Sequence, residues 1–572
     1  MDVTEVEVLV VGAGPVGLST ALMLGRFGIK TRVVERRVST STHPKAHVIN
    51  PRTMELFRQW GIADRIRAAA LPLEHGIGVG WMTRMTGIEL GSIVASDDPG
   101  ELAKMLADSS EGIVSCPQDE IEPILLEAVR ALGVDVSFDA ELTGIAQDSA
   151  GVDVTVRRTG ESAESSMRAR YVVAADGARS PVRELLGIRS DEIAPVGHMI
   201  NAHFQADLTH LTRDRPYVVW WIINLRTQGA FIALNGSDRW TYNFAFDPAR
   251  ESAGDFPPER CAEIIREAAG DPDLTIDVRS VLPWKLEIAI AERFRDGRVF
   301  LAGDAAHRFP PTGGFGMNTG VQDAHNLAWK LAAVLRGQAG ERLLATYEEE
   351  RVPVARFNAT QSMRNAEKMA QTGALLTDPQ ALSAIEEPAG GELRTRLAAA
   401  IPAQKEHFFF QGQTFGHVYA SAAVIDDGSQ APRSTIGEYR MSARPGALAP
   451  HAWFRTADGA RVATVDLMRD GFLVLTGPHG QPWIDAARDV GREFGLAIAA
   501  YRVGPDGDLQ DEDDAWQQVW GVGPRGCVVV RPDGHVALRH PDLDADLASV
   551  LHNLLARHET GARSFTSAEN RP

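Results

Sequence analysis

The stretch that most constrains the fold stands near the N-terminus, where a strand pattern runs into a glycine motif. Residues Val6–Val11 form an almost continuous apolar run, which is typical of a central parallel strand. The run ends in GAGPVG, residues 12–17, and a helix pattern and a second strand, Thr31–Val34, follow. This order predicts a dinucleotide-binding βαβ unit, because the glycines allow a tight turn and the helix N-terminus favours a phosphate.

Acidic residues stand at the ends of three apolar runs. Glu35, Asp176 and Asp304 each follow a short buried-strand pattern, and glycine accompanies the last two. In a doubly wound sheet the carboxyl ends of parallel strands meet at one edge, where ligands bind. We therefore expect the three acids to converge on one site.

A glycine-rich loop follows Asp304 and reads RFPPTGGFGMNTG, residues 308–320. Its glycines let backbone N–H groups approach a flat or anionic ligand, and the helix pattern that starts near Asn318 directs its positive end to the same place. An ordinary strand–loop–helix connection would explain the glycines, but not the acid at the strand end or the adjacent Pro310 and Pro311. We interpret the stretch as a binding loop.

The remaining chain divides into two further patterns. Between Ile188 and Leu282 the sequence alternates and is aromatic, which predicts an antiparallel sheet able to cover a ligand with one face. Any single aromatic residue there is better explained as sheet core. The C-terminal part predicts a small α/β unit, with strands at Ala463–Leu467, Leu473–Thr476, Leu496–Tyr501 and Cys527–Arg531.

Charge and cysteine content exclude several classes of function. The net charge of -18 argues against nucleic acid or an anionic membrane as partner. The 3 cysteines, Cys116, Cys261 and Cys527, are far apart and lack metal-binding spacing, so we expect neither disulfides nor a metal. With no signal peptide and no membrane-spanning run, a cytoplasmic protein is expected. The sequence leaves a homodimer open.

Together these motifs carry a family resemblance. The GxGxxG motif with Glu35, Asp176-Gly177 before Arg179 and Ser180, and Gly303-Asp304 resemble the three fingerprints of class A FAD-dependent aromatic hydroxylases. HPKAHVINPRTMELFRQWGI and GDAAHRFPPTGGFGMNTGVQDAHNLAWKL are similar to the branch of phenol and 2,4-dichlorophenol hydroxylases and of polyketide and indolocarbazole tailoring oxygenases. TVDLMRDGFLVLTG and CVVVRPDGHVALR resemble that branch's C-terminal domain.

The resemblance implies an α/β fold with several units. They are a Rossmann-like FAD-binding domain of the para-hydroxybenzoate hydroxylase type, an antiparallel β-sheet substrate domain, a helical linker, a thioredoxin-like C-terminal domain without redox cysteines, and a disordered tail. The expected boundaries are 1–76, 112–182 and 283–360 for the FAD-binding domain, 77–111 and 183–282 for the substrate domain, 361–425 for the linker, 426–560 for the C-terminal domain and 561–572 for the tail.

Carried over residue by residue, the resemblance implies an FAD site. The motif glycines would hold the pyrophosphate, Glu35 the adenosine ribose, and Gln118 and Asp304 the ribityl chain. Lys45 stands where the family more often has arginine, and lysine keeps the charge without the bidentate fork. The expected cofactor-binding residues are Gly12, Gly14, Pro15, Val16, Gly17, Glu35, Arg36, Lys45, Gln118, Asp176, Gly177, Gly303, Asp304, Pro311, Gly314, Gly316, Met317 and Asn318.

The implied activity is a monooxygenase that uses NAD(P)H and O2 to hydroxylate an electron-rich phenol, pyridinol or polycyclic polyketide through a C4a-hydroperoxyflavin. Pro311 is expected beside the flavin ring. A base would make a phenol more reactive, and His47, Tyr217 and Tyr242 are candidates, although each is also explained as structural. Two alternatives stay open: Baeyer–Villiger or decarboxylative oxidation of a natural-product intermediate, and a flavin-binding protein without turnover.

Overall fold

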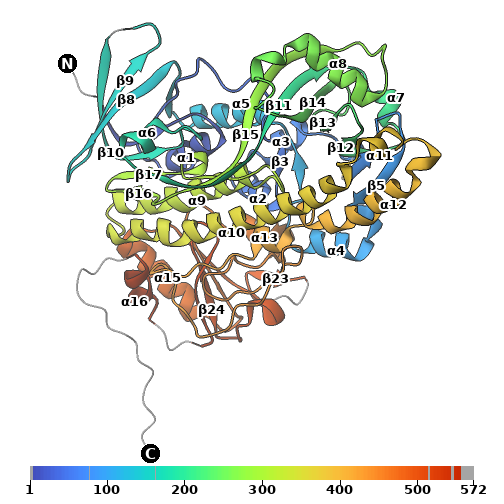
Figure 1. Cartoon of the computed structure of the whole chain (residues 1–572). Coiled ribbons are helices and arrows are strands. Elements are labelled where there is room, and N and C mark those ends of the chain that lie inside the picture. The colour runs from blue at the N-terminus through green and yellow to red at the C-terminus, as the bar shows by residue number, and fades with distance from the viewer. Residues whose placement is uncertain (1–3, 76–77, 162, 513–515, 543–545, 556–572) are drawn as a thin grey trace, which may run out of the picture.

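The computed structural model describes residues 4–75, 78–161, 163–512, 516–542 and 546–555. Two large sheets with their helices form the upper part of the molecule in Figure 1, and a smaller C-terminal unit lies beneath the long helix α10 (Arg342–Gly373). The tail expected at 561–572 lies outside the described residues.

The first sheet is built on five parallel strands in the order β17-β10-β1-β2-β7. Val8 and Val10 are fully buried, as expected for a strand with neighbours on both sides and packing on both faces. Helix α1 packs beside α5 and α9, and the hairpin β8–β9 extends β10. The strands are β1 (Thr4–Val11), β2 (Thr31–Val34), β7 (Asp135–Ser137), β8 (Ala140–Gln147), β9 (Val152–Arg158), β10 (Glu164–Ala174), β16 (Arg295–Asp296) and β17 (Val299–Leu301), and the helices are α1 (Pro15–Arg26), α2 (Pro51–Gln59), α3 (Ala63–Ala69), α5 (Gln118–Ala131), α6 (Pro181–Leu185) and α9 (Phe315–Leu335).

The second sheet is mostly antiparallel and has the order β18-β15-β11-β14-β13-β12-β4-β5. Its outer face packs against helix α8, with Phe204, Trp220 and Tyr242 in one apolar cluster with Ile265 of the helix. The elements are β4 (Gly78–Met82), β5 (Glu89–Val94), α4 (Pro99–Ala107), β11 (Ser190–Gln205), α7 (Thr209–Thr212), β12 (Tyr217–Ile223), β13 (Gln228–Ala233), β14 (Arg239–Phe246), α8 (Pro258–Ala269), β15 (Asp277–Ala291) and β18 (His307–Arg308).

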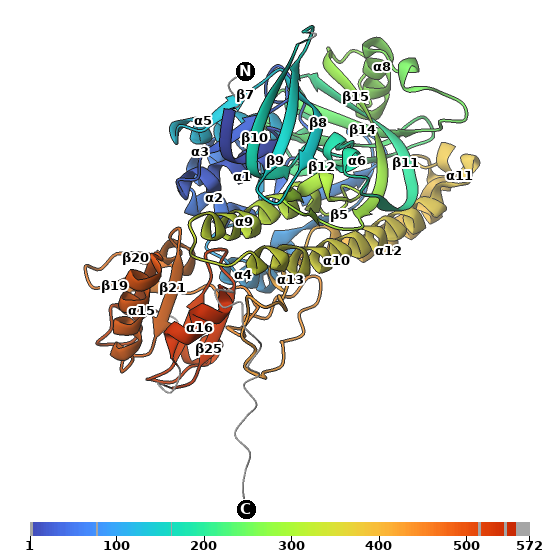
Figure 2. The same cartoon turned by 90° about the vertical axis from the view of Figure 1, so that its left-hand side faces the viewer.

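The inner face of the second sheet has two different halves. Over β12, β4 and β5 it is apolar, and Trp81 packs there with Leu393 and Leu397 of a helical segment. Over β11 and β14 it carries polar side chains, Asn201 and His203 among them. The helical segment, visible beside α10 in Figure 2, consists of α11 (Pro379–Ser383), α12 (Gly391–Ala400) and α13 (Gln411–Phe415).

The C-terminal unit contains a sheet of four strands in the order β22-β21-β24-β25, and a second sheet of three strands. Strand β21 is parallel to β22 and antiparallel to β24. The strand expected at Ala463–Leu467 is wrong, because Thr464–Leu467 form a helical turn in which the Asp466 carboxylate accepts the Ala463 N–H. The elements are β19 (Trp453–Thr456), β20 (Arg461–Ala463), α14 (Thr464–Leu467), β21 (Phe472–Thr476), α15 (Gln481–Phe494), β22 (Ile498–Arg502), β23 (Leu509–Asp511), β24 (Cys527–Val530), β25 (Val536–His540) and α16 (Leu547–Leu554).

A buried ionic network joins the C-terminal unit to helices α9 and α10. The Glu350 carboxylate accepts hydrogen bonds from Arg531 at 2.6 and 2.8 Å and from Lys330 at 2.7 Å. Arg531 also donates to Asp533, whose carboxylate accepts a hydrogen bond from Asn326 of α9 at 3.1 Å. Burial alone would raise the pKa of Glu350, but Arg531 and Lys330 hold it far below its usual value.

Glu350→Gln is expected to destabilise the protein by about 3–5 kcal/mol, because Lys330 and Arg531 would remain buried without their carboxylate. Urea unfolding followed by tryptophan fluorescence measures the change. The matched control is Glu349→Gln, which alters an exposed neighbour on the same helix. Equal stability of the two variants would show that the network is not needed to hold the C-terminal unit.

Buried histidines predict an acid-sensitive fold. Burial lowers the pKa of His325 to about 3 and that of His407 to about 4, against about 6.5 in an unfolded chain. The unfolded state therefore binds more protons at pH values between these limits, so stability is complete above about pH 6.5 and falls as the pH drops, by about 1.4 kcal/mol per pH unit and histidine.

Unfolding free energies measured between pH 7.5 and 5 test this dependence. His325→Gln should give a shallower pH slope than the unaltered protein, because one titrating group has been removed. His210→Gln, at an exposed position of α7, should keep the original slope. An unchanged slope in His325→Gln would contradict the assignment.

Candidate active site

The turn between β1 and α1 accepts only glycine at two positions. Gly12 has a φ of +105°, and a Cβ atom there would lie 2.3 Å from the Ala175 carbonyl oxygen. A Cβ atom on Gly17 would lie 1.9 Å from the Gly12 carbonyl oxygen. The turn is thus pressed against the end of β10, which brings the glycine motif beside Asp176.

Other glycines border open space. A Cβ atom on Gly14 would meet only the Glu122 carboxylate at 3.9 Å, and one on Gly177 or Gly316 would meet nothing within 4 Å. A ligand can approach the backbone amides at such positions closely, because glycine has no side chain to block it. Gly14 and Gly177 come from the first two fingerprints and Gly316 from the glycine-rich loop, so the predicted cradle is open at each of these three places.

Val16 of the first fingerprint packs against the third fingerprint and the start of α9. A Cβ atom placed on Gly303 would lie 2.8 Å from the Val16 Cγ2 atom, and one placed on Gly320 would lie 2.5 Å from it. Pro15 begins α1 immediately before Val16. The start of α1, the turn at Asp304 and the second turn of α9 are therefore in contact, as a shared ligand site requires.

The three acids differ in how much of their hydrogen-bonding capacity is used. The buried Glu35 carboxylate accepts the Ala13 N–H at 2.8 Å and the Arg37 N–H at 2.8 Å. Burial raises the pKa of Glu35, but the bonds from Arg37 and Ala13 outweigh it and hold the pKa below its usual value. The Arg37 side chain also donates to Glu35, through Nε at 3.0 Å and Nη2 at 3.4 Å. Glu35 is therefore an anion that orders the turn.

Asp176 and Asp304 have unused acceptors. Asp176 accepts the Val182 N–H through Oδ2 at 3.1 Å, and its buried Oδ1 has no partner among the described residues. Asp304 is solvent-accessible, yet desolvation raises its pKa while His307, Arg308 and Lys45 lower it. Asp304 makes no side-chain hydrogen bond among the described residues, so both carboxylates can accept ligand hydroxyl groups.

A buried triad holds the turn at Asp304. The Asp323 carboxylate of α9 accepts the Gly303 N–H at 3.1 Å, His307 Nε2 at 2.6 Å and Arg351 Nε at 2.6 Å. All three side chains are almost completely buried. Asp323 thereby fixes the strand end, the following loop and α10 relative to one another.

The N-terminus of α9 is fastened to the loop before α2. The Asn318 side chain accepts the Asn50 N–H at 3.0 Å and donates to the Val48 carbonyl at 2.9 Å and the Gly314 carbonyl at 2.7 Å. Gly314 has a φ of +69°, and a Cβ atom there would lie 2.8 Å from Val48. The Asn318 side chain is therefore occupied within the protein, and the backbone of this loop is what remains for a ligand.

The remaining predicted cofactor residues surround this core. Gln118, at the start of α5, donates to Glu122 at 2.6 Å. Lys45 is exposed near Asp304, whereas Arg36 is exposed beside the sheet. Pro311 is exposed and Met317 is half-buried.

Several residues of the site carried no signal in the sequence. Arg37, and not its neighbour Arg36, pairs with Glu35, and it also approaches Glu122 of α5 at 3.7 Å. Asn365 of α10 is fully buried, and its Nδ2 atom has no partner within the described part of the chain and lies 3.8 Å from a Cβ position on Gly313. Only the i, i+4 spacing of Gln118 and Glu122 on one helix hinted at Glu122.

The three base candidates lie in different places. His47 is in the loop before Val48, its Nδ1 is 3.0 Å from Ser115 Oγ, and burial lowers its pKa to about 4. Tyr242 is hydrogen-bonded to Thr227 at 2.8 Å, and Tyr217 donates to Glu89 at 3.0 Å. Both tyrosines belong to the cluster against α8, so the structure does not bring them to the face that meets the glycine-rich loop.

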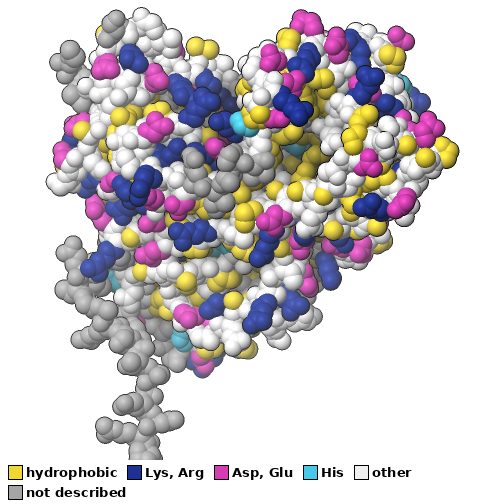
Figure 3. Space-filling model, in the orientation of Figure 1, with side chains coloured by type: hydrophobic (Ala, Val, Ile, Leu, Met, Phe, Trp, Pro, Cys, Tyr) yellow, Lys and Arg dark blue, Asp and Glu magenta, His cyan; other side chains and the backbone are white. Residues whose placement is uncertain are grey.

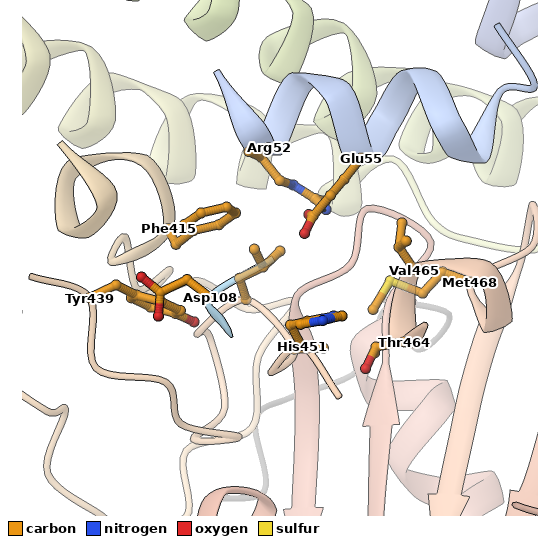
Figure 4. Close-up of a pocket in the computed structure, with 11 residues that line it drawn as sticks. Arg52, Glu55, Asp108, Phe415, Tyr439, His451, Thr464, Val465 and Met468 are labelled. Carbon is orange, nitrogen blue, oxygen red and sulfur yellow. The ribbon is translucent and has the colours of Figure 1, made fainter. Parts of the chain in front are cut away.

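A small cavity lies apart from this site, between α2 and the C-terminal unit (Figure 4). It is lined by Arg52, Glu55, Asp108, Tyr439 and His451 among others, and its volume is about 10 Å³. This volume holds about one water molecule. The cavity is therefore no substrate site, although it abuts the buried Arg52–Glu55 ion pair.

The outer surface is hollowed at the top of the molecule in Figure 3. The hollow is a notch with Lys and Arg side chains on both sides of it (Figure 3). Among the described residues, no group of three or more His, Cys, Asp or Glu side chains could hold a metal ion. Within the same ranges, no helix has the length and apolar content needed to cross a membrane.

Comparison with known proteins identifies the family to which the chain belongs. A family model for an FAD binding domain matches residues 5–362, and one for the C-terminal domain of aromatic-ring hydroxylases matches residues 442–557. The flavin-dependent monooxygenase PieE, solved with FAD and substrate, superposes with a TM-score of 0.90 at 33% identity, covering 97% of this chain and 99% of that one. Aklavinone-11 hydroxylase, solved with FAD and aklavinone, superposes at 0.82 with 35% identity, covering 97% and 100%.

Curated relatives span the same length. Tetracenomycin A2 monooxygenase-dioxygenase of Streptomyces glaucescens is 37% identical over 97% of each chain. The 2,4-dichlorophenol 6-monooxygenase of Delftia acidovorans is 34% identical over 97% of this chain and 99% of its own. The chain belongs to the family of FAD-binding aromatic-ring hydroxylases, and it is an FAD-dependent aromatic monooxygenase. Several of these names specify a hydroxylase, so hydroxylation is better supported than the Baeyer–Villiger and decarboxylative alternatives.

Gly12→Ala is expected to lower FAD affinity at least about tenfold, because the new methyl group meets the Ala175 carbonyl and the residue must keep a φ of +105°. The flavin-to-protein absorbance ratio after dialysis measures the loss. Gly61→Ala is the matched control, since Gly61 also has a positive φ, +77°, but its Cβ atom would meet nothing within 4 Å. The steric explanation fails if both variants retain FAD equally.

Proposed function

We propose that the protein hydroxylates a polycyclic phenol of the polyketide type, with NAD(P)H as reductant and O2 as oxygen donor. The observation that carries the proposal is the pairing of β18 with β15. Strand β18, His307–Arg308, directly precedes the glycine-rich loop, so the substrate sheet and the cofactor loop share an edge. Tetracenomycin A2 and aklavinone, named for two relatives, support the substrate class.

Within this proposal the chain's own residues hold FAD at the strand ends. The backbone at Gly12 and Gly14 binds the pyrophosphate, Glu35 the adenosine ribose and Asp304 the ribityl chain. The open cradle at Gly14 and the exposed Asp304 carboxylate support these roles. Bound FAD supplies the electron transfer and oxygen activation that side chains lack.

The protein's contribution to the chemistry is electrostatic and steric. Backbone N–H groups of residues 314–317, at the N-terminus of α9, stabilise negative charge on the bound ring system. Phe309 stacks on His307 with ring centroids 4.8 Å apart, and Pro310 is buried. These apolar groups, with Pro311, exclude water from the reacting atoms.

The reductant is proposed to approach from the side of Asp176 and Gly177. Arg308 Nε pairs with Glu287 at 2.9 Å, and Arg183 donates to the Ala178 carbonyl at 3.1 Å. Their cationic groups lie beside the turn that carries Asp176, where they attract an anionic dinucleotide.

The finer domain description is also a proposal. Strand order β22-β21-β24-β25, with α15 between β21 and β22 and α16 after β25, supports a thioredoxin-like C-terminal domain. Its only cysteine, Cys527, is buried in β24, which argues against a redox role. The proposed FAD-binding domain comprises residues 1–76, 112–182 and 283–360, the substrate domain 77–111 and 183–282, and the linker 361–425. Unpaired thiols favour the cytoplasm, and a homodimer stays a prediction.

Purified protein with FAD should oxidise NADH or NADPH faster when a suitable phenol is added. With 18O2 the product should gain one labelled oxygen atom while the carbon ring stays intact, which mass spectrometry detects. A single-ring phenol and the methyl ether of each active phenol serve as controls for substrate class. Label incorporated into an opened or ring-expanded product would contradict hydroxylation.

A further inference from the structure

Buried polar atoms without partners gather on the inner face of the second sheet. They are Asn201 Oδ1, both ring nitrogens of His203 and Nε2 of His43, none of which has a partner at hydrogen-bond distance in the described chain. The Asn201 side chain is nevertheless close enough to His43 to favour its protonated form. The three side chains are 7–8% exposed. Buried polar atoms are normally paired, so this cluster indicates a polar ligand.

The sheet places these groups on the face away from α8. Asn201 and His203 alternate along β11 with Ala202 and Phe204, which belong to the apolar cluster with α8. His203 is opposite Thr241 of β14 and Ser280 of β15. Their inner neighbours are thus polar as well.

His43 reaches this face from the loop that follows β2. Its Nδ1 lies 2.7 Å from Ser280 Oγ, and its ring meets that of His203 edge to face at 6.2 Å. When Nδ1–H donates to Ser280, Nε2 is an acceptor that is fixed in direction. Ser280 thus orients the His43 ring, and an oriented base of this kind is what proton transfer requires.

The same loop connects the cluster with the flavin site. Lys45, two residues after His43, acts electrostatically on both His43 and Asp304. Val48 then binds Asn318 and packs against Gly314 at the start of α9. The loop from His43 to Val48 therefore runs from the sheet cluster to the glycine-rich loop.

We propose that His43, Asn201 and His203 bind the phenolic hydroxyl of the aromatic substrate, and that His43 Nε2 accepts its proton. The inference rests on the proposed hydroxylase function. The phenol O–H bond breaks, the proton moves to His43, and the electron pair stays on oxygen as a phenolate, so no oxidant or reductant is consumed. The ionised ring is the better target for electrophilic oxygen.

The charges around His43 suit this role. Burial lowers the pKa of His43 and of His203 to about 4. For His43 the neighbouring Asn201 side chain opposes this shift and Lys45 adds to it, so both rings are neutral at pH 7. Arg239 of β14 and Arg279 of β15 act on His203 in the same direction. Arg239 itself pairs with Asp119 and Glu120 of α5. A weak base of this kind needs a stabilised phenolate, which the Lys45 cation provides.

The test compares His43→Gln and His203→Gln with His210→Gln, all with FAD bound. His43→Gln should lower product formed per NAD(P)H consumed by roughly 100-fold at pH 6.5. The defect should shrink as the pH rises through the pKa of the phenol, because the substrate then ionises without help. His203→Gln should mainly raise KM, and His210→Gln should match the unaltered enzyme.

Two outcomes would overturn the proposal. One is an unchanged coupling ratio and pH profile in His43→Gln, and the other is loss of FAD with normal turnover per bound flavin, which would assign the cluster to the cofactor. A phenol methyl ether, which has no proton to give, should show no difference between His43→Gln and the unaltered enzyme. Failure of the unaltered enzyme to hydroxylate any phenol would instead reject the proposed function itself.

Discussion

The carboxylate of Asp323 is the interaction on which the geometry of the site depends. It lies inside the protein on α9 and is shared by the Gly303 backbone, His307 and Arg351. Burial raises the pKa of Asp323, but Arg351 and His307 lower it more, so the group stays charged. One anion thus positions the strand end that bears Asp304, the strand that enters the second sheet and the long helix behind both. The binding loop is held at both ends by this charge, because His307 precedes the loop and Asp323 itself stands on the helix that follows it.

Two connections bring the second sheet to the FAD-binding unit. Strand β18 continues the sheet from the glycine-rich loop, and the segment from His43 to Val48 returns from the sheet to the N-terminus of α9. Both connections cross between units within a few residues. A ligand held between the units is therefore in contact with segments that also shape the FAD site, which is the arrangement a reaction between substrate and cofactor requires.

Sequence reasoning succeeded where a local rule decides the structure. The central strand β1 is where the apolar run predicted it, because a strand buried on both faces has to be apolar, and β2 has the predicted bounds. Gly12 and Gly17 are glycine for steric reasons. Sequence reasoning failed where the role of a residue depends on which face of the sheet its side chain occupies. Tyr242 points to α8, whereas Thr241 beside it points inward, and no local pattern tells these faces apart. The approach of His43 to Ser280 joins positions 237 residues apart, which only the folded topology reveals.

The ionic network at Glu350 has a consequence for how the protein can be divided. Its cations and anions come from α9, α10 and the turn between β24 and β25, and all of them are buried. Separating the C-terminal unit would leave charged side chains without their partners on both sides of the break. The boundary between the units is thus as buried as a protein core, although its contacts are ionic. The C-terminal unit supplies buried partners to α9, the helix that begins at the glycine-rich loop. Removing that unit is therefore expected to destabilise the FAD-binding unit as well.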